Sequence, residues 1–293
     1  MTTTFIKFDP IFKRKVWGGD KLNTFLNYNS PDNTGEVWLI SDRCTNQSTT
    51  RNGETLRSML ETRGKEIMGP KWNCNDRFPI LVKILDCKEK LSVQVHPTAS
   101  SQLGEPKTEF WFIMQSDEKS SLILGYNQNP DSITDSSSFN KVKSCEGDSV
   151  LVKAGTMHSI LAGNLILEIQ QNSNTTFRIY DWDRKGSRDL HLKDAMKCID
   201  FNSTPQLVKS NNDKIKVLAN CEAFKVTKLV IETKQYFTRE SNTQPIIISV
   251  VSGALMVEDE AINNGESILI PYISDFQSYT EIGCTIIITS DFT

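Results

Sequence analysis

The strongest constraint on the fold is a succession of short apolar runs between residues 78 and 170, separated by clusters of turn-forming residues such as 127–135. In 91–96 the apolar residues alternate with Ser92, Gln94 and His96. A period of two is the pattern of a β-strand with two different faces. Many short strands between Gly, Asp and Asn turns are typical of an antiparallel sandwich or barrel. The sequence therefore predicts a mainly β chain.

The expected strands cover 78–86, 91–96, 108–114, 121–124, 149–152 and 160–170. Leu56, Met59 and Leu60 recur at helical spacing before a Gly-Pro pair, which predicts a helix over 54–68. A second helix is expected over 193–199. The polar, turn-rich stretch 202–213 predicts a boundary between a domain of residues 1–200 and a second, smaller β domain of residues 201–293.

Charge and apolar runs exclude several classes of partner. The chain has 33 Lys+Arg against 36 Asp+Glu, a formal net charge of -3, so we expect no nucleic-acid partner. No run reaches the roughly 18 apolar residues of a membrane helix, and residues 1–12 lack the apolar core of a signal peptide. Seven scattered cysteines without a C-x-x-C pair indicate reduced thiols. We therefore expect a cytoplasmic protein without a membrane partner.

Histidine is scarce, which makes each position informative: the chain holds only His96, His158 and His191. Gln94 and His96 share one strand face, and Glu109 and His158 arrive on later strands, so the four can close a nitrogen and oxygen site for a divalent ion such as zinc. The two histidines can equally be satisfied polar residues at strand ends, with Glu109 in solvent. The spacing alone leaves both interpretations open.

A family resemblance extends across most of the chain. Eight segments, in order, resemble the type I mannose-6-phosphate isomerases of the cupin superfamily, in their short bacterial form. The segments are VWGG (Val16–Gly19), GEVWLIS (Gly35–Ser41), FPILVKILD (Phe78–Asp86), LSVQVHP (Leu91–Pro97), KTEFWFI (Lys107–Ile113), AGTMHSI (Ala154–Ile160), LEIQQNSNTTFRIYDWDR (Leu167–Arg184) and RDLHLKDA (Arg188–Ala195).

The resemblance implies a cupin-type jelly-roll barrel domain with a few peripheral helices and a second, smaller, cupin-like β domain. It implies one zinc ion per chain, held by Gln94, His96, Glu109 and His158. The implied reaction interconverts mannose 6-phosphate and fructose 6-phosphate through a cis-enediol, and the implied partner is this small-molecule substrate. The chain is expected to be a monomer or a homodimer.

The same resemblance places Lys107 and Arg178 in the substrate pocket. Glu168 is our candidate for the proton-transfer base, and its alternative role is that of a structural partner of an arginine. Arg178 suits a developing oxyanion or ring opening, and its alternative is a salt bridge with Asp181 or Asp183.

Phosphate recognition needs cations and hydroxyl or amide donors, and the candidates are Ser92, Lys83 and Lys107. Lys83 can instead lie at a strand edge with its charge in solvent. Trp17 is assigned to the wall of the pocket or to the core. His191, at an expected helix start, is assigned a structural role.

Two other functions remain open at this stage: another cupin metalloenzyme such as an iron oxygenase, and a sugar-phosphate-binding cupin that does not catalyse a reaction. The C-terminal region contains no histidine, so we expect it to act as a structural cover or an interface.

Overall fold

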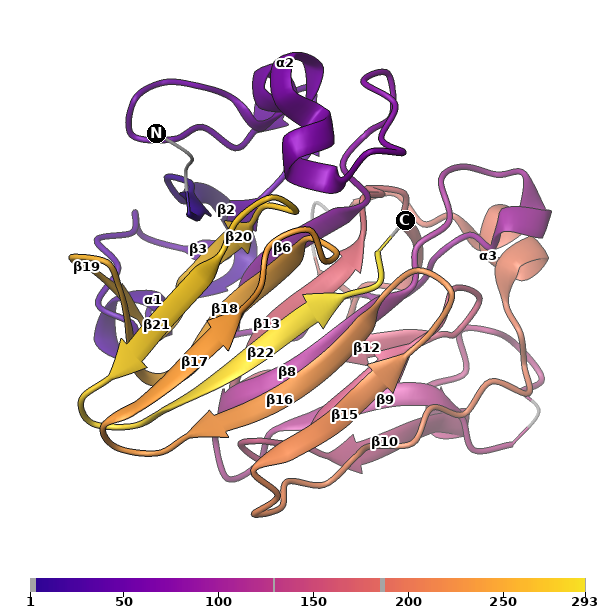
Figure 1. Cartoon of the computed structure of the whole chain (residues 1–293). Coiled ribbons are helices and arrows are strands. Elements are labelled where there is room, and N and C mark those ends of the chain that lie inside the picture. Colours follow the sequence, from indigo (N-terminus) through magenta and orange to yellow (C-terminus); the bar gives the residue numbers. More distant parts are fainter. Residues whose placement is uncertain (1–3, 129, 185–187, 293) are drawn as a thin grey trace. The chain divides into compact units, whose positions relative to one another are not determined.

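The computed structural model describes residues 4–128, 130–184 and 188–292, and it is mainly β, as predicted (Figure 1). The α-helices among these residues are α1 (Lys21–Thr24), α2 (Leu56–Met68) and α3 (Leu192–Cys198). None of the helices in the described part is both long enough and apolar enough to cross a membrane.

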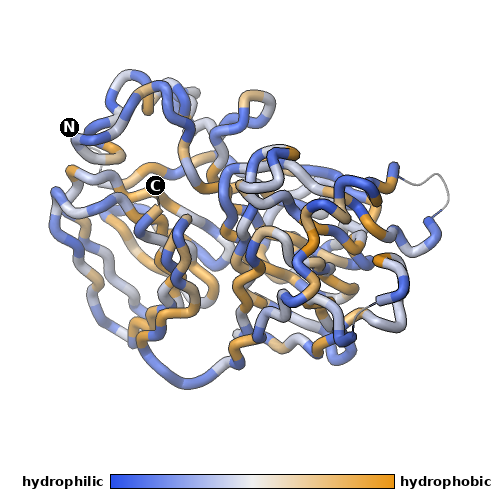
Figure 2. Tube along the Cα trace, turned by 90° about the vertical axis from the view of Figure 1, so that its right-hand side faces the viewer, coloured by the Kyte–Doolittle hydropathy of each residue, from blue (hydrophilic) through white to orange (hydrophobic). Residues whose placement is uncertain are grey.

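The chain forms two compact units. The histidine-containing unit consists of Phe12–Val37 and Ile84–Asn211, and the C-terminal unit of the described parts of Met1–Ile11, Trp38–Lys83 and Asn212–Thr293. In both units the hydrophobic stretches gather in the interior and the hydrophilic ones lie mostly along the outer turns (Figure 2). This division of the chain assigns helix α2 to the same unit as the C-terminal strands. The predicted division into domains of residues 1–200 and 201–293 stays a prediction.

Two β-sheets supply the core of the histidine-containing unit, and residues 38–40 and 80–83, at the ends of two strands of the first, fall in the other unit. The six-stranded sheet has the order β11-β8-β13-β6-β2-β3, and the five-stranded sheet the order β10-β9-β12-β7-β14. The strands of the first are β2 (Ile11–Gly19), β3 (Thr34–Ile40), β6 (Ile80–Cys87), β8 (Glu109–Ser116), β11 (Ser149–Val152) and β13 (Asn164–Gln171). Those of the second are β7 (Val93–Val95), β9 (Ser121–Tyr126), β10 (Phe139–Lys143), β12 (His158–Ile160) and β14 (Phe177–Tyr180).

The two sheets pack face to face. Ile113 on β8 and Ile166 on β13 share one buried apolar cluster with Leu124 on β9 and Ile160 on β12. Burial of such side chains contributes roughly 1.5–3 kcal/mol each to folding. The outer face of the five-stranded sheet packs against α3 through Ala195 and Cys198. Polar side chains on the inner faces are therefore enclosed between the two layers.

The C-terminal unit contains a nine-stranded sheet in which β20, β18, β22, β16 and β15 lie side by side (Figure 1). Its strands are β1 (Ile6–Lys7), β15 (Ile215–Asn220), β16 (Lys225–Ile231), β17 (Gln235–Arg239), β18 (Ile246–Val257), β19 (Glu260–Asn263), β20 (Ser267–Ile270), β21 (Phe276–Thr280) and β22 (Cys284–Ser290). A two-stranded pair, β4 (Asp42–Arg43) and β5 (Asn46–Gln47), precedes α2.

Helix α2 confirms the predicted helix over 54–68. The Thr55 side chain accepts a hydrogen bond from the Ser58 amide and caps the first turn, which satisfies one of the amides left free at a helix start. Leu56, Met59 and Leu60 are buried, as their spacing predicts. The helix 193–199 is also confirmed, as α3, with one residue of difference at each end.

Two local predictions were wrong. The single strand expected over 160–170 is two strands, β12 and β13, because Gly163 has φ +88 and turns the chain between them. The alternation expected over 91–96 puts Leu91 on one face with Val93 and Val95, but β7 begins only at Val93, and Leu91 packs into the cluster between the sheets.

Candidate metal centre

Three buried side chains meet on the inner faces of the two sheets. His96 follows β7, Glu109 begins β8 and His158 begins β12, and each is 1 % exposed. Strand pairing places His158 opposite Gln94. Tertiary pairing of β7 with β12, rather than spacing in the sequence, thus brings the predicted ligands together.

Glu109 lies between the two imidazoles. Its Oε2 is 3.3 Å from His96 Nε2, and its Oε1 is 3.3 Å from His158 Nε2. The three ligand atoms all lie within 4.8 Å of one another. Gln94 Nε2 is 3.3 Å from His158 Nε2. Gln94, the fourth predicted ligand, therefore contacts the cluster formed by the other three.

Backbone carbonyls fix the tautomer of both histidines. His96 Nδ1 is 2.9 Å from the Thr175 carbonyl oxygen, and His158 Nδ1 is 2.8 Å from that of Thr156. A carbonyl only accepts hydrogen bonds, so both Nδ1 atoms carry the proton and both Nε2 lone pairs face Glu109. This orientation is the one that metal-binding histidines require.

The turn before His158 places the Thr156 carbonyl. Gly155 has φ +87, a left-handed conformation that glycine adopts readily, and its amide donates to the His96 carbonyl at 2.9 Å. The two ligand-bearing segments are therefore joined by the backbone as well as by their side chains.

The electrostatic environment keeps the site in its metal-binding protonation state. Burial, together with the charge of Lys107, lowers the pKa of His96 to about 3, and burial lowers the pKa of His158. Burial alone would raise the pKa of Glu109, but the ammonium charge of Lys107 outweighs it and holds this pKa well below its ordinary value. Neutral imidazoles and a carboxylate are the forms that bind metal ions.

The residues fit a divalent metal ion by their own geometry. Tetrahedral zinc with bonds of about 2.0–2.1 Å has ligand atoms about 3.3 Å apart, which matches both histidine–carboxylate distances. Glu109 Oε1 has no hydrogen-bond partner among the described residues. A turn of the Gln94 amide exchanges Nε2 for Oε1 and adds an oxygen ligand.

Lys107 contacts the same ligands. Its Nζ is 2.7 Å from Glu109 Oε2 and 3.0 Å from His96 Nε2, and the residue is 5 % exposed. The ammonium group offsets the charge of the buried carboxylate. The structure thus brings this predicted pocket residue together with the predicted ligands.

Glu168 lies on the inner face of β13. Strand pairing places it opposite Trp111, whose indole Nε1 donates to Glu168 Oε1 at 3.1 Å. The Trp111 ring also packs edge-on against His158, with 5.4 Å between ring centroids. Trp111 therefore connects the candidate base to a candidate metal ligand.

Arg178 pairs with Gln94 across β14 and β7, so both side chains leave the same face. Its guanidinium donates to the Asp189 carbonyl at 2.8 Å. The salt bridge considered for Arg178 with Asp181 or Asp183 is not found among the described residues. The Asp181 carboxylate is bound by Arg184 and Arg188, and the Asp183 carboxylate accepts from the Tyr180 hydroxyl. His191 Nδ1 accepts from the Arg178 amide at the start of α3, which agrees with its structural assignment.

The remaining candidates occupy different environments. Ser92 is buried, and its hydroxyl donates to Gln94 Oε1 at 3.3 Å. Trp17 packs in the apolar cluster between the two sheets. Lys83 is buried rather than at a solvated edge, in the C-terminal unit, with its Nζ 5.2 Å from the centroid of the Trp38 ring.

Sequence reasoning missed four residues that surround the cluster. Thr156 and Thr175 act through backbone carbonyls, for which a sequence carries no signal. Trp111 carries no sequence signal beyond that of an aromatic residue in an expected strand. Gln170 could have been found, because it follows Glu168 by two positions and a strand places both on one face.

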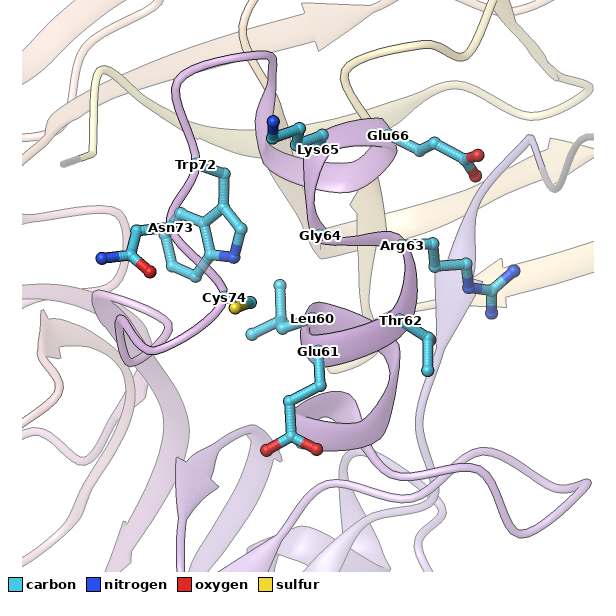
Figure 3. Close-up of a pocket in the computed structure, with 10 residues that line it drawn as sticks. All are labelled: Leu60, Glu61, Thr62, Arg63, Gly64, Lys65, Glu66, Trp72, Asn73 and Cys74. Carbon is cyan, nitrogen blue, oxygen red and sulfur yellow. The ribbon is translucent and has the colours of Figure 1, made fainter.

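A separate surface cleft of about 580 Å³ lies beside α2 in the C-terminal unit (Figure 3). It is bounded by the second half of α2 and by Trp72, Asn73 and Cys74. Arg63 and Glu66 leave the helix on the side away from Trp72 (Figure 3). No predicted site residue lines this cleft, so we assign the chemistry to the buried cluster instead.

Comparison with known proteins identifies the family. Residues 5–118 match the catalytic domain of type I phosphomannose isomerase. Mannose-6-phosphate isomerase ManA of Bacillus subtilis (strain 168) is 33% identical over 305 residues, which cover 93% of this chain and 94% of that protein.

Solved structures agree with this match. The crystal structure of mannose 6-phosphate isomerase from Bacillus subtilis superposes with a TM-score of 0.85 and 30% identity, covering 98% of this chain and 99% of the other. A mannose 6-phosphate isomerase bound with zinc and yttrium has a TM-score of 0.79 at 14% identity, over 99% and 100% of the two chains, and shows the shared fold. The resemblance drawn from the sequence is confirmed, and the chain belongs to the type I phosphomannose isomerase family.

Proposed function

We propose that the chain is a zinc-dependent aldose–ketose isomerase that interconverts mannose 6-phosphate and fructose 6-phosphate. The observation that carries this proposal is the buried Glu109 carboxylate between two imidazoles whose Nε2 lone pairs face it, in a member of this enzyme family.

One zinc ion per chain would be held by His96, Glu109, His158 and Gln94. The donors are nitrogen and oxygen atoms without a thiolate, and the set suits zinc with positions left open for a substrate. When bound, the ion would supply Lewis-acid chemistry that polarises the sugar oxygens and stabilises negative charge by several kcal/mol.

The chain's own residues must move the proton. Isomerisation removes a proton from C2 of the open-chain aldose and returns one to C1 by way of a cis-enediol. Glu168 is our candidate for the carrier, since its carboxylate is buried on an inner face and oriented by the Trp111 indole. Lys107 can hold a sugar oxygen or pass a proton, because its ammonium group lies at the ligand cluster.

Arg178 is our candidate for stabilising the developing oxyanion or assisting ring opening. It shares a strand face with Gln94, and its guanidinium is fixed by the Asp189 carbonyl. Ser92, another candidate phosphate contact, donates to the proposed ligand Gln94. The phosphate role of Lys83 and the pocket role of Trp17 stay predictions.

We further propose that residues 1–200 form the catalytic domain and that 201–293 act as a structural cover. Within the C-terminal unit, the Tyr272 amide donates to the Ile67 carbonyl at 2.8 Å, and the rings of Phe78 and Phe292 pack 5.6 Å apart. Deleting 201–293 should therefore lower the melting temperature, and an unchanged melting temperature would contradict the structural role.

The test of function is a coupled assay that follows conversion of fructose 6-phosphate to mannose 6-phosphate. Activity should disappear after treatment with a chelator and return when zinc is added to the dialysed protein. Absence of turnover in the fully zinc-loaded protein, with tight binding of the sugar phosphate, would establish a binding protein instead. Oxygen consumption with bound iron would establish the oxygenase alternative.

A further inference from the structure

We propose that the side-chain oxygen of Gln170 accepts a hydrogen bond from a hydroxyl group of the sugar substrate. This inference rests on the proposed isomerase function and adds a residue that determines how the sugar is held.

The fold places Gln170 next to the metal ligands. In the pairing of β13 with β8, Gln170 lies directly opposite Glu109, and Glu168 lies opposite Trp111. Directly opposed residues point to the same face of a sheet, with Cβ atoms about 4.5–5.5 Å apart. Gln170 therefore shares the inner face with the carboxylate that links the two imidazoles.

The orientation of the Gln170 amide is determined by its neighbours. Its Nε2 donates to the Gln171 carbonyl at 2.8 Å and to the Ser173 carbonyl at 2.7 Å. Both partners are acceptors, so only the NH₂ end of the amide can face them. The oxygen end is thereby fixed on the other side and cannot exchange places with the nitrogen.

The oxygen held in this way lacks a donor. Gln170 is 0% exposed, and its Oε1 has no hydrogen-bond partner among the residues that the structure describes. Buried side-chain oxygens in folded proteins nearly always accept a hydrogen bond, and leaving one without a donor destabilises the fold. A bound ligand that carries a donor removes this cost.

The chemistry of the oxygen selects the ligand group. An amide oxygen only accepts hydrogen bonds, so it repels a phosphate group, whose oxygens are acceptors and negatively charged. The adjacent Glu109 carboxylate adds to this repulsion. A sugar hydroxyl is a neutral donor, and a hexose 6-phosphate carries several of them. Gln170 is therefore suited to the sugar part of the substrate and unsuited to its phosphate.

Binding of unreactive substrate analogues to the zinc-loaded protein tests the inference. The probes are mannitol 6-phosphate and its analogues that each lack one hydroxyl group, measured by titration calorimetry. Gln170→Met should weaken binding of mannitol 6-phosphate about three- to tenfold, as expected for loss of one neutral hydrogen bond. For one deoxy analogue, the substitution should change the affinity by less than twofold, because the partner hydroxyl is already absent.

Two further variants separate the oxygen from the loop that Gln170 anchors. Gln170→Glu removes the NH₂ group as Gln170→Met does but keeps an acceptor oxygen, so it should restore the discrimination between the parent compound and that deoxy analogue. Ser173→Ala removes the hydrogen bond from Ser173 Oγ to the Glu105 carbonyl, in the same loop. It should leave the discrimination unchanged. Zinc affinity, measured against a competing chelator, should change less than threefold in Gln170→Met.

The inference is overturned if Gln170→Met weakens all analogues equally, weakens none, or acts only through a loss of zinc. In each of these cases a wild-type protein that still isomerises its substrate leaves the proposed function intact. Failure of the wild-type protein to bind mannitol 6-phosphate and to turn over substrate would overturn the function itself.

Discussion

The two units of this molecule are built from the same kind of antiparallel sheet and differ in what their strands bury. In the histidine-containing unit the inner faces of β8 and β13 carry Glu109, Glu168 and Gln170 among apolar neighbours. In the C-terminal unit the main core cluster consists of residues such as Ile248, Leu255 and Ile286, all 0% exposed. The proposed chemistry thus depends on a few inward positions of the two facing sheets of one unit, and the shared architecture supplies only the framework.

The cost of these polar residues explains why they are few. A buried carboxylate is tolerated when cations and hydrogen bonds compensate for the water it has lost. Glu109 has Lys107 at 2.7 Å, and Glu168 has the Trp111 indole at 3.1 Å. In the C-terminal unit, Ser249 and Ser267 bury two neutral hydroxyls that bind each other at 2.7 Å. In the histidine-containing unit, buried polar groups remain available to bind a ligand. In the C-terminal unit, the two serine hydroxyls bind each other.

The largest expected effect follows from removing the carboxylate. Glu109→Gln keeps the size of the side chain but removes the charge between the imidazoles, so zinc content should fall and kcat/KM should drop at least about a thousandfold, the equivalent of several kcal/mol. The coupled isomerase assay and elemental analysis measure both effects. A variant that keeps its zinc and its activity would show that the cluster is not the site.

The matched change in the other unit should act on stability alone. Ile248→Ala removes a fully buried side chain from the C-terminal core and should lower the free energy of unfolding by about 2–5 kcal/mol. Below its melting temperature, kcat per folded molecule should stay within about twofold of wild type. Urea denaturation and the coupled assay check the two halves of this prediction. A large fall in kcat of the folded variant would contradict the division of roles between the units.

Trp111→Phe should have an intermediate effect. The substitution keeps an aromatic ring beside His158 but removes the hydrogen bond to Glu168. Loss of a hydrogen bond to a buried charged group costs about 1.5–3 kcal/mol, so kcat should fall by about tenfold to a hundredfold while zinc content stays unchanged. An unaltered kcat would mean that Glu168 needs no orientation by Trp111 or takes no part in the reaction.

Strands and helix α2 could be predicted from the sequence because their signals are local. The spacing of Leu56, Met59 and Leu60 defines the buried face of α2, and Thr55 and Gly69 supply its ends. The split of 160–170 into two strands was missed because apolar residues lie on both sides of Gly163 and Asn164, the pair that breaks the run and marks the turn. Apolar patterns report burial, and they do not show where the chain reverses.

The site could be predicted in part, and the family resemblance was needed to choose between two interpretations of the histidines. His96 and His158 are 62 positions apart, and only the pairing of β7 with β12 joins their strands. The carbonyls of Thr156 and Thr175 belong to the backbone, so residue identity does not reveal them. Gln170 was missed although the alternation of β13 points to it, because glutamine alone indicates no particular chemistry.

The smallest expected effect is a change in the pH dependence of stability, and it arises from Asp86, a buried carboxylate whose pKa shifts in the opposite direction to that of Glu109. Burial raises the pKa of Asp86 from 3.8 to about 6, although the amide groups of Leu22 and Lys21 oppose the shift, whereas the pKa of Glu109 is held well below its ordinary value. The folded state therefore binds more protons at Asp86 than the unfolded state does between about pH 4 and 6. Stability from this group is present below that window and declines as the pH rises through 6.

Asp86→Asn should remove this pH dependence without affecting the site. The Asp86 carboxylate accepts a hydrogen bond from the Leu22 amide at 3.1 Å, so the substitution also causes a loss of stability that does not depend on pH. The informative quantity is therefore how the stability difference between the two proteins changes with pH. The free energy of unfolding of wild type minus that of Asp86→Asn should be larger at pH 5 than at pH 7.5, by urea denaturation. A pH-independent difference would show that Asp86 titrates normally. Zinc content at pH 7.5 should match that of wild type, because Asp86 binds an amide of α1 whereas Glu109 is itself a proposed ligand.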